Sequence, residues 1–325
     1  MIVLGIESTA HTFGIGILKD GKILADIKRQ YRPEKGGIVP NDAMEFLKSV
    51  KEEILEEALK EAKLEIKDIN IFAISQGPGM PLSLHIGMNF AKELAKKYKK
   101  PLIPVNHLVG HLSIGLMLTE VKDPVFILAT GANTQIIAFE GGKYRVFGEC
   151  LSIGLGNALD KFGRAIELEF PAGPKIEELA KKGKYIELSY VVKGMDVEFS
   201  GIVTQASNLY KKGAKKEDLC YSIQETCFAM LTEVSERAMA HCDKKELLLI
   251  GGVAANQRLI EMLEIMCKER NAEFKVVPIQ YSGDCGGQIA VQGFLEGKNK
   301  KFSKKETENL DINPIWRVEE VEIKY

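Results

Sequence analysis

The chain opens on apolar runs that are separated by short polar turns. The runs cover residues 2–7, 13–18 and 23–28, and the segments between them are rich in Ser, Thr, Asp, Gly and Lys. Apolar runs of this length, bounded by turn-forming residues, are typical of β-strands. We therefore predict a meander of three strands at the start of the chain.

The hydrophobic period then changes to that of a helix. Apolar residues recur at four-residue spacing among Lys and Glu, at Phe46, Val50, Ile54 and Ala58. This spacing predicts an amphipathic helix, which Asn41 or Asp42 could cap. A strand-like run at 69–75, a helical pattern over about 85–98 and a short strand at 102–105 follow, and this order is typical of a βαβ unit with parallel strands.

The opening pattern returns in the second part of the chain. Strand-like runs occupy residues 125–130, 135–139 and 144–148, again separated by a polar turn and by a turn rich in glycine. A buried-type strand at 246–250 then leads through two glycines to a helix over about 256–269. A repeat of this kind indicates a duplicated lobe.

The duplication predicts an α/β protein of two lobes, residues 1–124 and residues 125–325, with a C-terminal tail that could pack back on the first lobe. A duplicated meander followed by βαβ is the layout of the actin, sugar-kinase and heat-shock-ATPase superfamily, whose two-lobed fold has duplicated mixed sheets and a nucleotide between the lobes. This step is an analogy of fold and does not fix the chemistry. A Rossmann-like protein is the alternative.

Composition bounds the classes of protein that remain. The chain has 325 residues, 45% of them hydrophobic, which suffices for two cores. Its 44 Lys and Arg residues balance 45 Asp and Glu, so a net charge of −1 gives no general attraction for nucleic acid, and RNA contact requires a local patch or a partner. The six cysteines form no CxxC pair, and no apolar run approaches the roughly 18 residues that span a bilayer. We expect a cytoplasmic protein without a membrane segment.

Two histidines, His107 and His111, stand four residues apart. One helical turn places both imidazoles on the same face, where they can bind one metal ion, and the alternative is a pair of ordinary histidines. A zinc protease needs Glu directly after the first histidine, but Leu108 stands there. Asp284 precedes a predicted helix, so its carboxylate could either cap that helix or complete a His-His-carboxylate metal site.

Glycine-bearing turns at strand ends favour phosphate, because glycine lets backbone N–H groups approach an anion and helix N-termini favour negative charge. The candidate turns are Ser8-Thr9, Thr130-Gly131-Ala132-Asn133, Gly154-Leu155-Gly156-Asn157 and Gly251-Gly252. Asp160 and Glu177 lie beside glycine-rich stretches, where they either take ribose hydroxyls or are exposed charges in first helical turns. Asn256 either caps the next helix or faces the base.

Longer strings resemble one family over essentially the whole chain. They are GIESTAHTFGIGI, SQGPG, NHLVGH, GANTQ, VFGECLSIGLGNALDKFGR, FPAGPKIEELA, VKGMDVEFSGI, SIQETCFAML, GGVAANQRL and the GD of YSGDCGG. They are similar to the universal tRNA threonylcarbamoyltransferase catalytic subunit, which belongs to the KEOPS complex in archaea and eukaryotes. The VFGE and KGMD motifs resemble those of archaeal members of the family.

The resemblance implies a metal ion, a nucleotide and a reaction. One divalent or ferric ion, iron or zinc, would be held by His107, His111 and Asp284. Threonylcarbamoyl-AMP, AMP or ATP would lie in the cleft against Leu128, Ala129, Thr130, Gly131, Ala132, Asn133, Asp160, Gly173, Glu177, Gly251, Gly252 and Asn256. The threonylcarbamoyl group would pass to N6 of adenosine 37 in tRNAs that read ANN codons, and AMP would leave. An atypical small kinase and a small dimerising subunit of a KEOPS-type complex are the implied partners.

Five positions depart from the family pattern. Phe46 and Leu47 replace consecutive histidines, and His85 replaces the usual Arg. Ala132 replaces a glycine, and Leu128 stands where a tyrosine often joins the metal shell, so we expect water or substrate oxygens to complete the coordination. A catalytically degenerate paralogue that serves as a scaffold or regulatory subunit is therefore the alternative function. A sugar or acetate kinase is disfavoured, because no acidic residue is obviously placed as a phosphoryl-transfer base.

Overall fold

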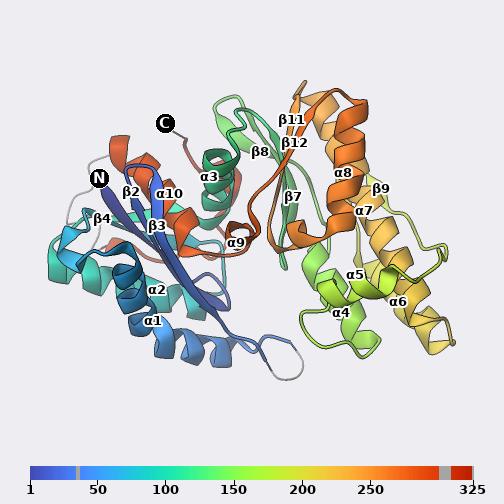
Figure 1. Ribbon diagram of the computed structural model, residues 1–325, viewed down its shortest axis with the longest axis horizontal. Helices are drawn as coiled ribbons and strands as arrows, with labels where there is room; N and C mark the ends of the chain where they lie inside the picture. The colour runs from blue at the N-terminus through green and yellow to red at the C-terminus, as the bar shows by residue number, and fades with distance from the viewer. Residues whose placement is uncertain (34–36, 300–308, 324–325) are drawn as a thin grey trace. The chain divides into compact units, whose positions relative to one another are not determined.

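The computed structural model describes residues 1–33, 37–299 and 309–323, which form two compact units (Figure 1). One unit comprises Met1–Ile114 with Asp284–Tyr325, and the other comprises Gly115–Gly283. Each unit is built on a five-stranded sheet that mixes parallel and antiparallel pairs. The duplicated mixed sheets that the sequence predicted are therefore present.

The first unit contains the predicted meander and the predicted βαβ unit. Its sheet has the order β3-β2-β1-β4-β5. The strands are β1 (Ile2–Glu7), β2 (Thr12–Lys19), β3 (Lys22–Gln30), β4 (Ile71–Gly77) and β5 (Leu102–Asn106). β1, β2 and β3 pair antiparallel, whereas β4 pairs parallel with both β1 and β5.

Helices cover both faces of the first sheet. α1 (Pro40–Ala62) and α2 (Pro81–Tyr98) pack on one face, and α10 (Gly286–Asn299) packs on the other (Figure 1). Alternate strand residues separate the two cores, because Leu4 and Ile74 point towards α1 and α2, whereas Val3 and Ala73 meet Ile289 of α10. α3 (His107–Thr119) begins directly after β5, and the short 3₁₀ helices η1 (Ile66–Asp68) and η3 (Val318–Glu320) complete the unit.

The start of α1 corrects one detail of the prediction. The helix begins at Pro40, one residue before Asn41, and its N-cap is Val39 without a side-chain cap. Neither Asn41 nor Asp42 is therefore the N-cap, because proline is favoured at the first helical position and moves the start forward. Leu47, which was not among the predicted apolar positions of this helix, is fully buried, whereas Phe46, which was, is only partly buried.

The second unit repeats the meander. Its sheet has the order β12-β11-β6-β7-β8. The strands are β6 (Val125–Ala129), β7 (Thr134–Glu140), β8 (Lys143–Glu149), β11 (Glu246–Ile250) and β12 (Glu273–Val276), and β9 (Val192–Lys193) and β10 (Asp196–Val197) form a separate pair. The helices are α4 (Leu155–Ala165), α5 (Gly173–Ala180), α6 (Ser200–Lys211), α7 (Lys216–His241), α8 (Gln257–Glu269), α9 (Ile279–Ser282) and the 3₁₀ helix η2 (Gly252–Ala255). Among the described residues, no helix is long and apolar enough to cross a membrane.

Helix α10 belongs to the first unit, although the sequence placed residues 125–325 in one lobe. The physical reason is a backbone-to-backbone contact between α10 and the meander. A Cβ atom on Gly16 would lie 2.2 Å from Gly287 N, and a Cβ atom on Gly286 would lie 2.0 Å from Gly16 N. The described tail also contacts this unit, since Asn313 N donates a hydrogen bond to Gln76 O (2.8 Å).

We expect Gly16→Ala to destabilise the chain by about 1–3 kcal/mol or more, because the added methyl group pushes α10 off a close-packed sheet. The free energy of unfolding in urea is the measurement. Gly201→Ala in α6 is the matched control, because a Cβ atom there meets no heavy atom within 4 Å. An unfolding free energy for Gly16→Ala equal to that of the wild type would show that α10 does not rest on this glycine.

Candidate metal centre and nucleotide site

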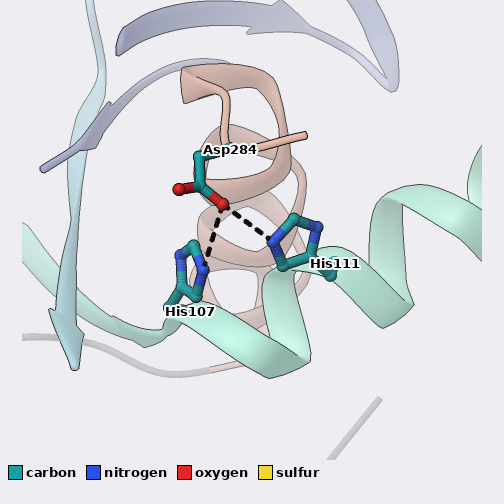
Figure 2. Close-up of side chains that lie close together, drawn as sticks. All are labelled: His107, His111 and Asp284. Carbon is teal, nitrogen blue, oxygen red and sulfur yellow. Dashed lines mark ion pairs between the residues drawn. The ribbon is translucent and has the colours of Figure 1, made fainter. Parts of the chain in front are cut away.

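Helix α3 presents both histidines on one face (Figure 2). The last residue of β5, Asn106, caps the helix, because its Oδ1 accepts hydrogen bonds from Leu108 N (3.0 Å) and Val109 N (3.1 Å). The rings of His107 and His111 lie with centroids 4.7 Å apart and an angle of 85° between their planes. The cap thus fixes the helix start that carries the first imidazole.

Asp284, just before α10, directs one carboxylate oxygen at both imidazoles (Figure 2). Its Oδ1 is 3.5 Å from His107 Nε2 and 3.4 Å from His111 Nε2. The ligand atoms of all three residues lie within 4.8 Å of one another. The prediction brought Asp284 from the C-terminal lobe, but this residue belongs to the same unit as both histidines.

Glu7, at the end of β1, orients His107. The carboxylate is fully buried, and its Oε2 lies 2.9 Å from His107 Nδ1. Its Oε1 accepts hydrogen bonds from the backbone N–H (2.7 Å) and the hydroxyl of Thr9. A carboxylate that holds Nδ1 leaves Nε2 directed at Asp284, which is the usual arrangement behind a metal-binding histidine.

Sequence reasoning did not single out Glu7. The available signal was one acidic residue in an otherwise apolar strand. The turn Ser8-Thr9, which the sequence offered as a phosphate site, lies beside this carboxylate instead, and Thr9 Oγ1 is also 3.4 Å from His107 Nδ1.

The charges of this cluster shift the pKa of each member. Burial lowers the pKa of His107, but the carboxylates of Glu7 and Asp284 outweigh burial and raise that pKa to about 10. Burial, helped by the positive charge of His107, lowers the pKa of His111. Burial raises the pKa of Asp284, but the two imidazoles hold it well below its usual range. Near pH 7 without metal, His107 therefore carries a proton, whereas His111 is neutral and Asp284 is ionised.

The donor atoms fit a metal ion. Both ring nitrogens of His111 are buried and have no hydrogen-bond partner among the described residues. The two N···O separations exceed the roughly 2.7–3.2 Å of an N–H···O hydrogen bond. They agree with the ~3.3–3.5 Å between two ligands of a tetrahedral ion whose bonds are about 2.0–2.1 Å. Two imidazoles and one carboxylate are also the donor set of many catalytic zinc and iron sites.

Metal binding to this cluster is expected to release about one proton per ion between about pH 7 and 9, because His107 must lose its Nε2 proton before that nitrogen can coordinate. Affinity for the metal should accordingly rise about tenfold for each pH unit in this window. Calorimetric titration in two buffers of different ionisation enthalpy measures the proton count. A heat of binding that is the same in both buffers would contradict this protonation state.

Three of the four turns predicted to bind a nucleotide, 130–133, 154–157 and 251–252, meet at one end of the second sheet. β6 and β11 are parallel neighbours, so their carboxyl ends lie side by side. Gly251, at φ +106°, packs on the end of β6, where a Cβ atom would lie 2.2 Å from Ala129 O. The turn 130–133 is bonded to the start of α4, because Gly156 N donates to Thr130 O (3.1 Å) and Asn157 N donates to Gly131 O (3.0 Å).

The two candidate carboxylates connect the helix starts around this edge. Asp160 Oδ1 accepts a hydrogen bond from Ala172 N (2.8 Å), directly before Gly173. Glu177 Oε1 accepts from Gln257 N (2.8 Å), at the start of α8. Both acids lie in the middle of their helices, so the alternative that they are exposed charges in first helical turns is wrong.

The remaining candidates differ in what their side chains do. Asn256 caps α8, because its side chain accepts from Arg258 N (3.0 Å) and Leu259 N (3.2 Å). Leu128 and Ala129 are fully buried in β6, so neither side chain lines the turn that follows. Gly252 has open space where a side chain would be.

Comparison with known proteins gives the family. The chain matches the family model described as tRNA N6-adenosine threonylcarbamoyltransferase over residues 22–291. A relative of that name from Thermococcus sibiricus is 50% identical over 326 residues, which cover 99% of each chain. A probable bifunctional tRNA threonylcarbamoyladenosine biosynthesis protein from Methanocaldococcus jannaschii is 45% identical over 327 residues, which cover 100% of this chain and 60% of that protein.

Solved structures with low sequence identity share the fold alone. HypF from T. kodakarensis matches with a TM-score of 0.65 at 16% identity, over 91% of this chain and 47% of HypF. A ROK hexokinase from Thermus thermophilus matches with a TM-score of 0.50 at 14% identity, over 92% of this chain and 100% of the hexokinase. The predicted actin-like and sugar-kinase fold class is thereby confirmed. The family model matches most of this chain, and a relative of the same length shares half of its residues. The chain therefore belongs to the tRNA N6-adenosine threonylcarbamoyltransferase family, whose members are acyltransferases of tRNA modification.

Proposed function

We propose that the chain transfers a threonylcarbamoyl group from threonylcarbamoyl-AMP to N6 of adenosine 37 in tRNAs that read ANN codons, and that it does so in the cytoplasm. Membership of the family supports the reaction class. The observation that carries the chemistry is the convergence of His107 and His111 on one oxygen of Asp284. This arrangement gives two neutral nitrogen donors and one anionic oxygen once the proton of His107 has left.

His107, His111 and Asp284 would hold one metal ion, zinc or iron. When bound, the ion would supply a Lewis acid for the carbamoyl carbonyl, because an exocyclic amine is a poor nucleophile and needs a polarised electrophile. Three protein ligands leave coordination positions for substrate oxygens. Glu7 keeps its hydrogen bond to His107 Nδ1 throughout, so Nε2 stays directed at the site. No side-chain nucleophile is needed, because the amine attacks the carbonyl directly and AMP leaves.

The adenylate would bind at the edge of the second sheet. Backbone N–H groups of the turn 130–133 and of the glycines at 251 and 252 would bind the phosphate, apart from those of Thr130 and Asn133, which are bonded within the turn. Asp160 and Glu177 would take the ribose hydroxyls on lone pairs additional to those that accept the backbone N–H groups of Ala172 and Gln257. The dependence of the family on a metal ion and a nucleotide supports both assignments.

Asp160→Asn is expected to weaken AMP binding about tenfold or more, because a hydrogen bond to a charged group contributes about 1.5–3 kcal/mol. The asparagine keeps an oxygen that can accept the hydrogen bond from Ala172 N. Titration calorimetry with AMP is the measurement.

Glu178→Gln serves as the matched control for Asp160→Asn. Glu178 is exposed and pairs with Lys181, so its charge can be removed without touching the proposed ribose site. AMP affinity in Asp160→Asn equal to that in Glu178→Gln would show that Asp160 is a structural residue only.

Two of the five positions that depart from the family pattern, Phe46 and Leu47, lie away from the proposed metal centre. Leu47 belongs to the core between α1 and the first sheet, and Phe46 packs on Tyr31 with ring centroids 6.0 Å apart. Both lie on the sheet face opposite α10 and therefore away from Asp284. These two replacements leave the cluster of His107, His111 and Asp284 intact, and this cluster favours the transferase over a scaffold.

Partners are part of the proposal. A chain of net charge −1 lacks the Lys and Arg excess that would hold tRNA alone at physiological salt. We infer that it works with a small atypical kinase and a small dimerising subunit of a KEOPS-type complex. The bifunctional name and greater length of the M. jannaschii relative support a second component of the same pathway acting with this one.

A reconstituted transfer assay tests this function. Purified chain, metal ion, tRNA and separately prepared threonylcarbamoyl-AMP are incubated with and without the two partner subunits, and modified adenosine and AMP are quantified. Equal amounts of both products, formed efficiently only with the partners, are expected. Rapid multiple-turnover modification by the isolated chain would contradict the partner requirement, and AMP release without modified tRNA would contradict the transferase.

A further inference from the structure

We propose that Asp26, on β3, is a positioning residue for Asp284: it caps the N-terminus of α10 and so leaves the Asp284 carboxylate to the two histidines. This inference rests on the metal centre proposed above. Asp26 is not one of the three proposed ligands, and it lies on β3, away from both α3 and the segment before α10 that carry them.

Asp26 makes its contact directly beneath the start of α10. Its Oδ1 accepts a hydrogen bond from Gly287 N at 2.8 Å, across 261 positions of sequence. Asp26 is paired with Gly16 on the neighbouring strand, so both lie on the same face of the sheet. Because Gly16 has no side chain, the backbone of α10 packs directly against β2. Asp26 provides the acceptor for the Gly287 N–H at this contact.

Asp284 would otherwise be the natural acceptor for the same end of the helix. It stands two and three residues before Gly286 and Gly287, the first residues of α10. Asp side chains at this distance commonly accept hydrogen bonds from the following backbone N–H groups, in Asx-turns and helix caps. Such a local bond would turn the carboxylate away from His107 and His111.

The structure divides the two tasks between two carboxylates. Asp26 takes the N–H of Gly287, whereas Asp284 places Oδ1 at 3.5 Å and 3.4 Å from the Nε2 atoms of His107 and His111. Close contacts at Gly16 and Gly286 fix the depth of α10 on the sheet. The hydrogen bond that Asp26 accepts from Gly287 N satisfies a donor at the helix end that would otherwise compete for the Asp284 carboxylate.

Zinc affinity, measured by competition with a chelating dye, tests this role. Asp26→Ala and Asp26→Leu remove the acceptor, and we expect each to weaken zinc binding about tenfold or more, which is the range for residues that orient metal ligands. Asp26→Asn retains an oxygen for Gly287 N, and its zinc affinity should stay within about threefold of the wild type. Having both Ala and Leu variants keeps the test decisive if one of them does not fold.

A matched control separates positioning from general stability. Ile54→Ala removes a buried side chain of α1, on the opposite face of the same sheet, so it should lower the melting temperature and leave zinc affinity unchanged. If Asp26→Ala or Asp26→Leu lowers the melting temperature in the same way with wild-type zinc affinity, the positioning role is overturned. Loss of affinity in Asp26→Asn as large as in Asp26→Ala would equally overturn it.

Failure of this inference can be told from failure of the metal centre. If the wild type binds no zinc, or if His111→Ala binds as tightly as the wild type, then the metal centre falls and the role of Asp26 falls with it. If the wild type binds one equivalent, His111→Ala does not, and the variants of Asp26 bind normally, then the metal centre stands and only the positioning role is wrong.

Discussion

The double variant His107→Ala/His111→Ala is expected to purify without stoichiometric metal and to lose transfer activity about a thousandfold. Loss of a Lewis acid removes several kcal/mol of transition-state stabilisation, and each ~1.4 kcal/mol corresponds to a factor of ten in rate. The fold should persist with reduced stability. Both nitrogens of His111 are buried without a hydrogen-bond partner among the described residues, so removing this side chain costs no hydrogen bond. Removing His107 leaves the buried Glu7 carboxylate without its bond to Nδ1, which should cost about 1–3 kcal/mol. Elemental analysis and the reconstituted transfer assay are the measurements.

His85→Ala provides the control for this variant, because His85 is exposed on α2. It should retain the metal content and the activity of the wild type. One equivalent of tightly bound metal in the double variant would sink the assignment of these two histidines as ligands.

Glu7→Ala is expected to lower metal affinity about 10–100-fold, the usual cost of losing a residue that orients a metal ligand. It should also reduce the free energy of unfolding by about 1–3 kcal/mol, because His107 Nδ1 and the two donors of Thr9 lose a buried acceptor. Metal affinity from chelator competition and unfolding in urea measure the two effects separately.

Glu7→Gln and Thr9→Ser refine this test. The glutamine amide can donate to Nδ1 and so favour the imidazole tautomer that carries its proton on Nε2, which cannot bind metal. Thr9→Ser keeps both donors to Glu7 and should behave as the wild type. Nitrogen-15 NMR of the ring reports the tautomer. Unchanged metal affinity and tautomer in Glu7→Gln would show that this carboxylate does not orient His107.

The strands of both meanders were predictable because their signals are local. Apolar runs between turn residues placed β1, β6 and β11 within one residue of the observed bounds. Helix starts were less predictable. α2 begins at Pro81, four residues before the expected 85, because proline at the first helical position is a start signal that apolar periodicity does not contain.

The place of α10 was not predictable from local pattern. Its sequence follows the strands of the second unit, yet glycines of β2 allow its backbone to descend on the first sheet. A glycine in a strand reads locally as a weak point or a bulge. The role of Gly16 as a contact for the backbone of α10 depends on residues far away in sequence, so it cannot be inferred from the strand alone.

The sequence predicted that His107, His111 and Asp284 lie together, which the structure confirms, but it did not predict the carboxylates that bond to this cluster. The spacing of His107 and His111 is a property of one helix turn. The residues around Asp284 left it open as a helix cap or a third ligand, and the resemblance to a family favoured the ligand. Glu7 and Asp26 were missed, because their partners lie 100 and 261 positions away. No local pattern distinguishes such carboxylates from ordinary strand residues.

The nucleotide candidates show the same division. Asn256 was correctly offered as a cap, because capping is a local preference. The bonds of Asp160 to Ala172 and of Glu177 to Gln257 arise only when α4, α5 and α8 pack together. Charge type and sequence position could not distinguish these bonded acids from solvent-exposed ones.

A metal titration under single-turnover conditions tests most directly whether the transfer depends on one metal ion held by His107, His111 and Asp284. Metal-free chain with its partners, tRNA and threonylcarbamoyl-AMP receives increasing zinc or ferrous iron, and the rate of adenosine modification is followed against bound metal. We expect a rate that rises in proportion to occupancy and saturates at one ion per chain, with no rise in His111→Ala. Full-rate modification by the metal-free chain, or a metal-dependent rate that is unchanged in His111→Ala, would contradict it.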